Sequence, residues 1–166
     1  MQLDHYTSIF KKRKFPITII CDNVINAQNI GSLLRASDAF GIEKIYFCGS
    51  NIPIGRKMTK TSRATEKVVD FEVAENAFNI IKEFKNKGFQ IIALEITSNS
   101  KAITEVSFTN HQPIILVIGD ENFGISDDIL KLSDNTIHIN MYGQNSSMNV
   151  VQATTIALYE ITKQIM

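Results

Sequence analysis

Short, continuously apolar runs alternate along this chain with longer stretches in which apolar residues recur at helical spacing. A continuous apolar run of about four to eight residues is typical of a strand that is buried on both faces of a sheet. Such runs predict strands at residues 15–21, 44–48, 68–71, 89–95, 113–119 and 135–139. Apolar residues three and four positions apart predict helices at residues 29–40, 74–87, 126–132 and from about 148 onward.

Buried strands that alternate with helices are the pattern of an α/β protein. We therefore expect a mostly parallel sheet with helices on both faces. Ligands of such sheets bind beyond the carboxyl ends of the strands. The loops to search for a site are those that follow Cys21, Leu94, Ile118 and Ile139.

The length of 166 residues predicts one domain, residues 1–166, because two ordinary domains need a longer chain. Apolar residues make up 44% and charged residues 20%, as is usual for a globular protein. The longest apolar run, residues 113–118, is far shorter than a membrane span. Residues 1–15 lack the apolar stretch of a secretory signal, so we expect a cytoplasmic protein without membrane contact.

The formal net charge is zero, which argues against a strong nonspecific affinity for nucleic acid. The basic residues nevertheless form two clusters, at residues 11–14 and 56–67, and the second lacks strand or helix periodicity. A basic loop rich in Thr and Ser suits phosphate contacts, whereas a solvated surface explains either cluster equally well.

The two cysteines, Cys21 and Cys48, each end an apolar run, which favours buried thiols over a disulfide. The spacing of potential ligands predicts no metal site.

The loop at residues 139–151, INMYGQNSSMNVV, combines turn residues with small polar side chains before an apolar helix. Gly143 permits a tight or left-handed bend, and the polar residues after it can hydrogen-bond to the local backbone. Asn149 lies at the mouth of the helix. The loop is either a ligand site or an ordinary turn before an N-capped helix.

Two further loops carry similar features. After Cys21, Asn29 is a candidate N-cap, and Gly31 allows another backbone or a ligand to approach the first helical turn. Arg35 suits either a phosphate or a surface carboxylate. After Ile118, Gly119 and Gly124 bracket an acidic pair, Asp120 and Glu121, which either caps the next helix or serves a ribose or a cation.

Several common sites are disfavoured. Neither GxGxxG nor GxxxxGK[ST] occurs, which argues against a dinucleotide or P-loop site. His5, His111 and His138 stand apart, and none has a Ser or Cys partner in a candidate loop, so a hydrolase triad is weakly supported.

Three ordered motifs are present: NxGxxxR (Asn29, Gly31, Arg35), GxExxG (Gly119, Glu121, Gly124) and I(x)MxGxxxS(x)NV (Ile139, Met141, Gly143, Ser147, Asn149, Val150). Together they resemble the motifs of the SpoU/TrmH family of RNA ribose 2'-O-methyltransferases, within the SPOUT superfamily. The match extends from about residue 22 to residue 160. The third motif is the most specific of the three.

The resemblance implies an S-adenosyl-L-methionine cofactor bound in a bent conformation, a C-terminal deep trefoil knot and a homodimer. Such a knot is a rare exception among protein chains. The implied cofactor-binding residues are Leu94, Gly119, Ile139 and Met148, of which Ile139 and Met148 would sandwich the adenine. The implied catalytic residues are Arg35, Asn29, Glu121, Ser147 and Asn149. A guanidinium is a poor base at neutral pH, so we interpret Arg35 as a phosphate clamp.

The implied substrate is RNA, and we expect tRNA rather than rRNA because no separate RNA-binding domain precedes the motifs. The sequence departs from the family pattern at Asn122, Asn140 and Met148, where Gly, Pro and Leu are common, and at Ala64, where Gly is common. Met for Leu preserves the pocket volume. The rival hypothesis is a catalytically silent, RNA-binding relative; a nicotinamide oxidoreductase is disfavoured by the missing glycine fingerprint.

Overall fold

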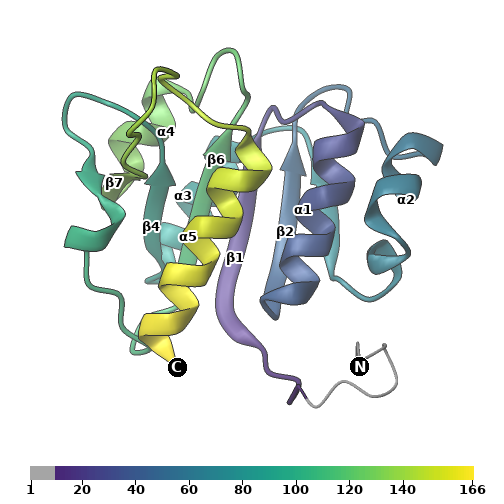
Figure 1. Cartoon of the computed structure of the whole chain (residues 1–166), viewed down its shortest axis with the longest axis horizontal. Coiled ribbons are helices and arrows are strands. Elements are labelled where there is room, and N and C mark those ends of the chain that lie inside the picture. Colours follow the sequence, from purple (N-terminus) through teal and green to yellow (C-terminus); the bar gives the residue numbers. More distant parts are fainter. Residues whose placement is uncertain (1–9) are drawn as a thin grey trace.

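The structure, a computed structural model, describes residues 10–166, so His5 lies outside the described residues. Within that range seven strands form one parallel sheet in the order β3-β2-β1-β6-β4-β7-β5 (Figure 1). The strands are β1 (Phe15–Asp22), β2 (Ile42–Cys48), β3 (Phe71–Ala74), β4 (Gln90–Leu94), β5 (Lys101–Ala102), β6 (Ile114–Gly119) and β7 (Asn135–His138).

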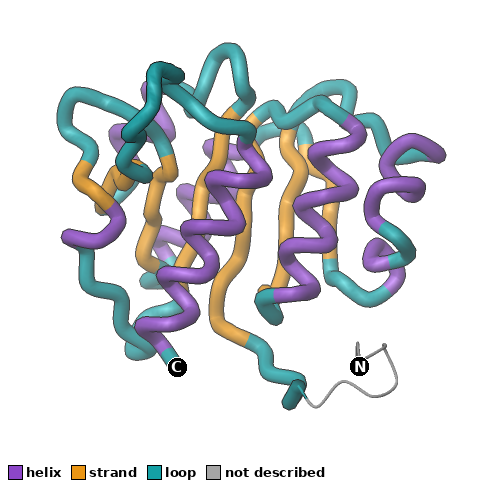
Figure 2. Tube along the Cα trace, in the orientation of Figure 1, coloured by secondary structure: helices purple, strands orange, loops and turns teal. Residues whose placement is uncertain are grey.

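Helices cover both faces of the sheet, as the sequence predicts. Figure 1 shows α1 and α5 in front of the strands and α3 and α4 behind them, and Figure 2 shows the strands between these two layers. The helices are α1 (Ala27–Ala39), α2 (Arg56–Ser62), α3 (Ala77–Asn86), α4 (Asp127–Leu132) and α5 (Val150–Ile165), with 3-10 turns η1 (Thr65–Lys67) and η2 (Ile103–Glu105).

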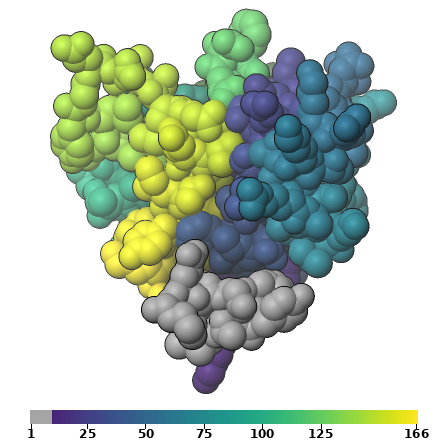
Figure 3. Space-filling model, turned by 45° about the vertical axis from the view of Figure 1, so that its right-hand side comes forward, coloured from purple at the N-terminus to yellow at the C-terminus, as the bar shows by residue number. Residues whose placement is uncertain are grey.

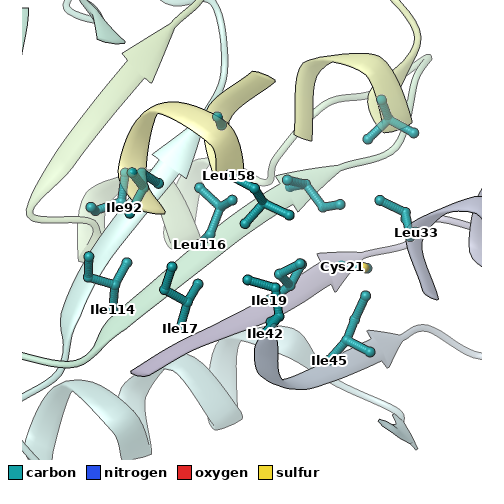
Figure 4. Packing of buried hydrophobic residues seen from close by; sticks show 14 of the residues in the cluster. Ile17, Ile19, Cys21, Leu33, Ile42, Ile45, Ile92, Ile114, Leu116 and Leu158 are labelled. Carbon is teal, nitrogen blue, oxygen red and sulfur yellow. The ribbon is translucent and has the colours of Figure 1, made fainter. Parts of the chain in front are cut away.

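The continuous apolar character of the strands follows from this arrangement, because successive side chains enter two different cores. Ile19 and Leu116 pack with Leu158 of α5 on one face (Figure 4). Ile20 and Val117 face the other side, in the core that α3 and α4 contribute to. Each fully buried side chain of this size contributes about 1.5–3 kcal/mol relative to exposure.

The predicted strands and helices are confirmed except in the segment between β2 and β4. Residues 56–67, which show no periodicity, form α2 and η1. Met58 is the buried apolar residue of α2, and one such side chain leaves no stripe to detect. The strand expected at residues 68–71 lies at Phe71–Ala74 instead. The two-residue strand β5 is too short to show a pattern.

The strand order determines where a site can form. β6 lies between β1 and β4, so the carboxyl ends of these three strands are adjacent at the upper edge in Figure 1. The segment just before β1 lies at the opposite edge, where the Lys14 ammonium donates to the Ile42 carbonyl at 2.9 Å. The first basic cluster, residues 11–14, is therefore separated from the carboxyl ends of the strands. A trefoil knot stays a prediction.

Among residues 10–166, every helix is too short or too polar to cross a membrane.

Candidate functional site

A cavity of about 750 Å³ opens beyond the carboxyl ends of β4, β6 and β7. The four residues predicted to bind a cofactor, Leu94, Gly119, Ile139 and Met148, all line it. Three of the five predicted catalytic residues, Glu121, Ser147 and Asn149, line it as well. In Figure 3 the loops after β6 (green) and β7 (yellow-green) project beyond the upper end of α5 (yellow).

Hydrogen bonds join the three sequence motifs at the rim of this cavity. The Glu121 carboxylate oxygen Oε1 accepts from the Asn29 side-chain amide at 2.6 Å and from that of Asn149 at 2.9 Å. The Asn149 amide also donates to Asn29 Oδ1 at 3.2 Å. One carboxylate thus orients two amide side chains from separate helices, and hydrogen bonds to a charged acceptor are about twice as strong as neutral ones.

Asn149 also caps α5, because its Oδ1 accepts from the Val151 amide at 2.9 Å. The loop at residues 139–151 therefore ends in an N-capped helix and also lines a cavity, and its role as a ligand site stays a prediction.

The prediction that Asn29 caps the first helix is wrong. The N-cap of α1 is Asn26, whose Oδ1 accepts from the amides of Gln28 and Asn29 at 2.9 and 3.2 Å. Asn29 lies in the first turn, is buried, and directs its own amide toward Glu121. Both residues are asparagine and precede apolar helical positions, so local sequence alone does not distinguish them.

The motif glycines allow close backbone approach at two places. A Cβ atom on Gly31 would lie 2.5 Å from the Met58 carbonyl oxygen, so the expected close neighbour is the backbone of α2. A Cβ atom on Gly119 would lie 2.5 Å from the Gly124 carbonyl oxygen. The left-handed bend considered for Gly143 does not form, and a Cβ atom there would meet nothing within 4 Å.

Arg35 is separated from the other predicted catalytic residues. It is exposed on α1 and lines a second cavity of about 850 Å³ together with Lys57, Lys60 and Arg63. The separation follows from helical geometry, because six residues rotate the direction of a side chain by about 240° and advance it about 9 Å. Three residues of the second basic cluster, Lys57, Lys60 and Arg63, thus lie around Arg35.

One histidine does have a serine partner, contrary to the expectation from sequence. His138 Nδ1 lies 2.9 Å from Ser100 Oγ, and its Nε2 lies 3.2 Å from Asn140 Oδ1. The Ser100 hydroxyl already donates to the Thr97 carbonyl at 2.8 Å and accepts from the Thr97 amide at 3.0 Å, so it stabilises a turn. The contact between His138 Nε2 and Asn140 Oδ1 gives a role to Asn140, which stands where Pro is common in the family. It connects the loop that lines the cavity to the end of β7.

The two cysteines are free and buried, as predicted. Burial raises the pKa of the Cys21 thiol well above its ordinary value and that of Cys48 to about 12, and the carboxylate of Asp22 adds to both effects. Both groups are therefore neutral thiols at physiological pH.

Comparison with known proteins agrees with the geometry. A sequence profile of the SpoU rRNA Methylase family matches residues 16–159. The chain is 35% identical to a tRNA (guanosine(18)-2'-O)-methyltransferase from Aquifex aeolicus over 166 residues, 98% of this chain and 76% of that protein.

Two solved structures share the fold. The crystal structure of the A. aeolicus TrmH/SpoU tRNA modifying enzyme matches with a TM-score of 0.83 and 35% identity, covering 92% of this chain and 77% of that one. The AdoMet-bound rRNA methyltransferase from Sinorhizobium meliloti has a TM-score of 0.84 at 20% identity, covering 95% of this chain and 59% of that one.

Proposed function

The chain belongs to the SpoU rRNA Methylase family, and on that premise we propose that it transfers a methyl group from S-adenosyl-L-methionine to a ribose 2'-hydroxyl of RNA, with tRNA as substrate. The observation that carries the proposal is the convergence of Asn29, Glu121 and Asn149 at the rim of the cavity beyond β4, β6 and β7. The choice of tRNA is supported by the A. aeolicus relative, whose name specifies a guanosine of tRNA.

The residues around the cavity beyond β4, β6 and β7 fit the cofactor. Its volume of about 750 Å³ is within the usual range for small-molecule sites. Leu94, Ile139 and Met148 provide apolar surfaces for a planar base, and the backbone at Gly119 offers polar groups to its edge. When bound, S-adenosyl-L-methionine supplies an electrophilic methyl group on a positively charged sulfur.

The reaction asks the protein for positioning and for removal of one proton. A ribose 2'-oxygen must approach the methyl carbon in line with the leaving sulfur, and holding two reactants in such geometry is a large part of catalysis. Asn29, Glu121 and Asn149 form a fixed polar surface beside the cavity, with Ser147 at its lining. We assign to these four side chains the orientation of the ribose, whose proton passes to water or to a neighbouring group.

Arg35 acts in this proposal through the RNA backbone. Its cavity contains four cationic side chains, Arg35, Lys57, Lys60 and Arg63, and none of the described residues that line it is acidic. Guanidinium groups bind phosphate oxygens in a bidentate manner. Arg35 would thus fix the phosphate of the reacting nucleotide, and the lysines would hold the adjoining backbone.

We further propose that the protein is a homodimer that acts in the cytoplasm. Ile156 and Tyr159 are exposed on the same side of α5, with 43% and 61% of their surface accessible, and would be covered by a second copy. Two copies of a neutral chain can present one continuous positive groove to RNA.

Calorimetry and a transfer assay test the function together. We expect binding of S-adenosyl-L-methionine without binding of NAD, and transfer of a labelled methyl group to tRNA transcripts. Cofactor binding without transfer to tRNA or rRNA would favour the silent RNA-binding relative. Binding of NAD in place of S-adenosyl-L-methionine would exclude a methyltransferase.

A further inference from the structure

We propose that Glu95 and Asp22 are positioning residues of the methyl-transfer site, which fix the turn carrying Glu121 from two opposite sides. The inference rests on the proposed function. Neither carboxylate belongs to the three sequence motifs.

The two carboxylates accept hydrogen bonds from consecutive backbone amides. Glu95, directly after β4, accepts from the Ile125 amide through Oε2 at 3.1 Å. Asp22, the last residue of β1, accepts from the Ser126 amide through Oδ2 at 3.2 Å. Their other oxygens accept from groups close in sequence, the Ile96 amide at 2.8 Å and the Asn23 side chain at 3.1 Å.

The order of the sheet explains how two distant acids reach the same segment. β1 and β4 are the two neighbours of β6, and Asp22 pairs directly with Gly119 at the end of β6. The chain that leaves β6 therefore passes between the two carboxylates. Asp22 is only 7% exposed, and a buried carboxylate is costly unless hydrogen bonds satisfy it. The Ile125 and Ser126 amides are thus fixed by two carboxylates whose positions the sheet determines.

The turn between Gly119 and Gly124 is a unit that these bonds attach to the sheet. Within the turn, the Gly124 amide donates a hydrogen bond to the Asp120 carbonyl at 2.8 Å. Asp120 Oδ1 accepts from the amides of Asn122 and Phe123 at 2.8 and 3.1 Å. Ser126 is the N-cap of α4, and its side chain makes no capping bond. Asp22 accepts from the backbone amide of this residue, so it holds the start of α4 as well.

Gly124 shows how closely the turn approaches Glu95. A Cβ atom on Gly124 would lie 2.5 Å from Glu95 Oε2, and its φ of +68° is one that residues with a side chain rarely adopt. The glycine thus allows the carboxylate to reach the backbone at this point.

The position of this turn affects both parts of the site. Residues Gly119 to Gly124 line the cofactor cavity, and Glu121 within the turn bonds to Asn29 and Asn149. A displaced turn would therefore change cofactor affinity and the polar surface at the same time. A loss of folding stability alone would lower the amount of active protein and leave the KM for S-adenosyl-L-methionine unchanged.

The test compares Glu95→Gln and Asp22→Asn with wild type and with Glu75→Gln, an exposed glutamate that follows β3. Loss of a hydrogen bond to a charged acceptor changes an equilibrium or rate constant by about tenfold or more. We expect Glu95→Gln to raise the KM and Kd for S-adenosyl-L-methionine about tenfold and to lower kcat. Glu75→Gln should match wild type. A Glu95→Gln enzyme whose KM and kcat stay within twofold of wild type overturns the proposal.

Amide hydrogen exchange keeps the proposal testable if a variant does not fold or if the wild type transfers no methyl group. In the wild type the Ile125 and Ser126 amides should exchange slowly, as hydrogen-bonded groups do. Rapid exchange of both amides in a folded wild-type protein by itself overturns the proposal that Glu95 and Asp22 fix this turn. A wild type with slow exchange but no cofactor binding instead contradicts the proposed function.

Discussion

The Glu121 carboxylate and the Asn29 side-chain amide lie 2.6 Å apart, although 92 residues separate them along the chain. This bond joins the turn after β6 to the first turn of α1. Asn149 adds a second donor to the same carboxylate oxygen at 2.9 Å. The three motifs thus meet in one hydrogen-bonded group, which gives Glu121 a central place in the proposed site.

Replacing Glu121 by Gln tests that place. The variant removes the charge that both amide donors approach, so each bond becomes weaker and the ribose-facing surface less fixed. We expect kcat to fall about 10- to 100-fold, the range for hydrogen bonds to charged groups. Steady-state kinetics with tRNA measures the effect, with Glu105→Gln, an exposed glutamate in η2, as the control. Unchanged kcat would remove Glu121 from the site.

Gly119→Ala tests the close packing of the turn. The added methyl group would lie 2.5 Å from the Gly124 carbonyl oxygen and from the Ile125 amide nitrogen, so the turn must move. We expect a free energy of unfolding lower by about 1–3 kcal/mol, as is typical of overpacking, and weaker binding of S-adenosyl-L-methionine. Urea unfolding and calorimetry provide the measurements.

Gly55→Ala is the matched control for this variant, because a Cβ atom on Gly55 meets nothing within 4 Å and its φ of −179° suits any residue. If the two alanine variants bind the cofactor equally well, the contact between Gly119 and Gly124 is not needed for the site.

The contrast between strands and side-chain contacts shows what this sequence can predict. β1 and β6 are continuously apolar because both faces of the sheet are covered, and that pattern is local. The bond from Asn29 to Glu121 depends on the strand order instead, which local patterns do not determine. The resemblance to the family predicted that Asn29 and Glu121 belong to one site. It also placed Arg35 in that site, whereas the structure places Arg35 at a second cavity.

Two other differences between prediction and structure, the N-cap of α1 and the helix α2, have local causes. Asn26 and Asn29 offer the same capping chemistry three residues apart, so the choice between them depends on tertiary contacts. α2 spans seven residues with one buried apolar side chain, and it is stabilised by packing against α1 rather than by a recognisable stripe. Asp22 and Glu95 are the first charged residues after the apolar runs that end at Cys21 and Leu94, and that position was the available signal for them.

Arg35→Lys distinguishes a phosphate clamp from a base. Lysine keeps a positive charge near neutral pH but loses it toward its pKa of about 10.4, whereas arginine stays charged. We expect measurable turnover near pH 7 and a steeper loss than wild type as pH rises toward 10. A pH–rate profile with tRNA gives the answer. No turnover at any pH, with RNA binding intact, would contradict the clamp.

The buried thiols make stability depend on alkaline pH. The Cys48 pKa is raised from an ordinary value of 9.0 to about 12 by burial and by Asp22, so the unfolded chain loses the thiol proton first. The stabilisation is fully present below about pH 9 and is lost as pH rises toward about 12. Urea unfolding between pH 8 and 10.5 should show a declining free energy of unfolding, and a shallower decline in Cys48→Ala. Equal slopes would show that Cys48 does not contribute.

We propose that this protein methylates a ribose 2'-hydroxyl of tRNA. The most direct measurement is a map of ribose methylation in RNA from cells with and without the gene for this protein. We expect 2'-O-methylation to disappear at a tRNA position when the gene is deleted. It should return with the wild-type gene and be strongly reduced with the Glu121→Gln variant. An unchanged methylation map of tRNA, in cells that normally express the protein, would contradict it.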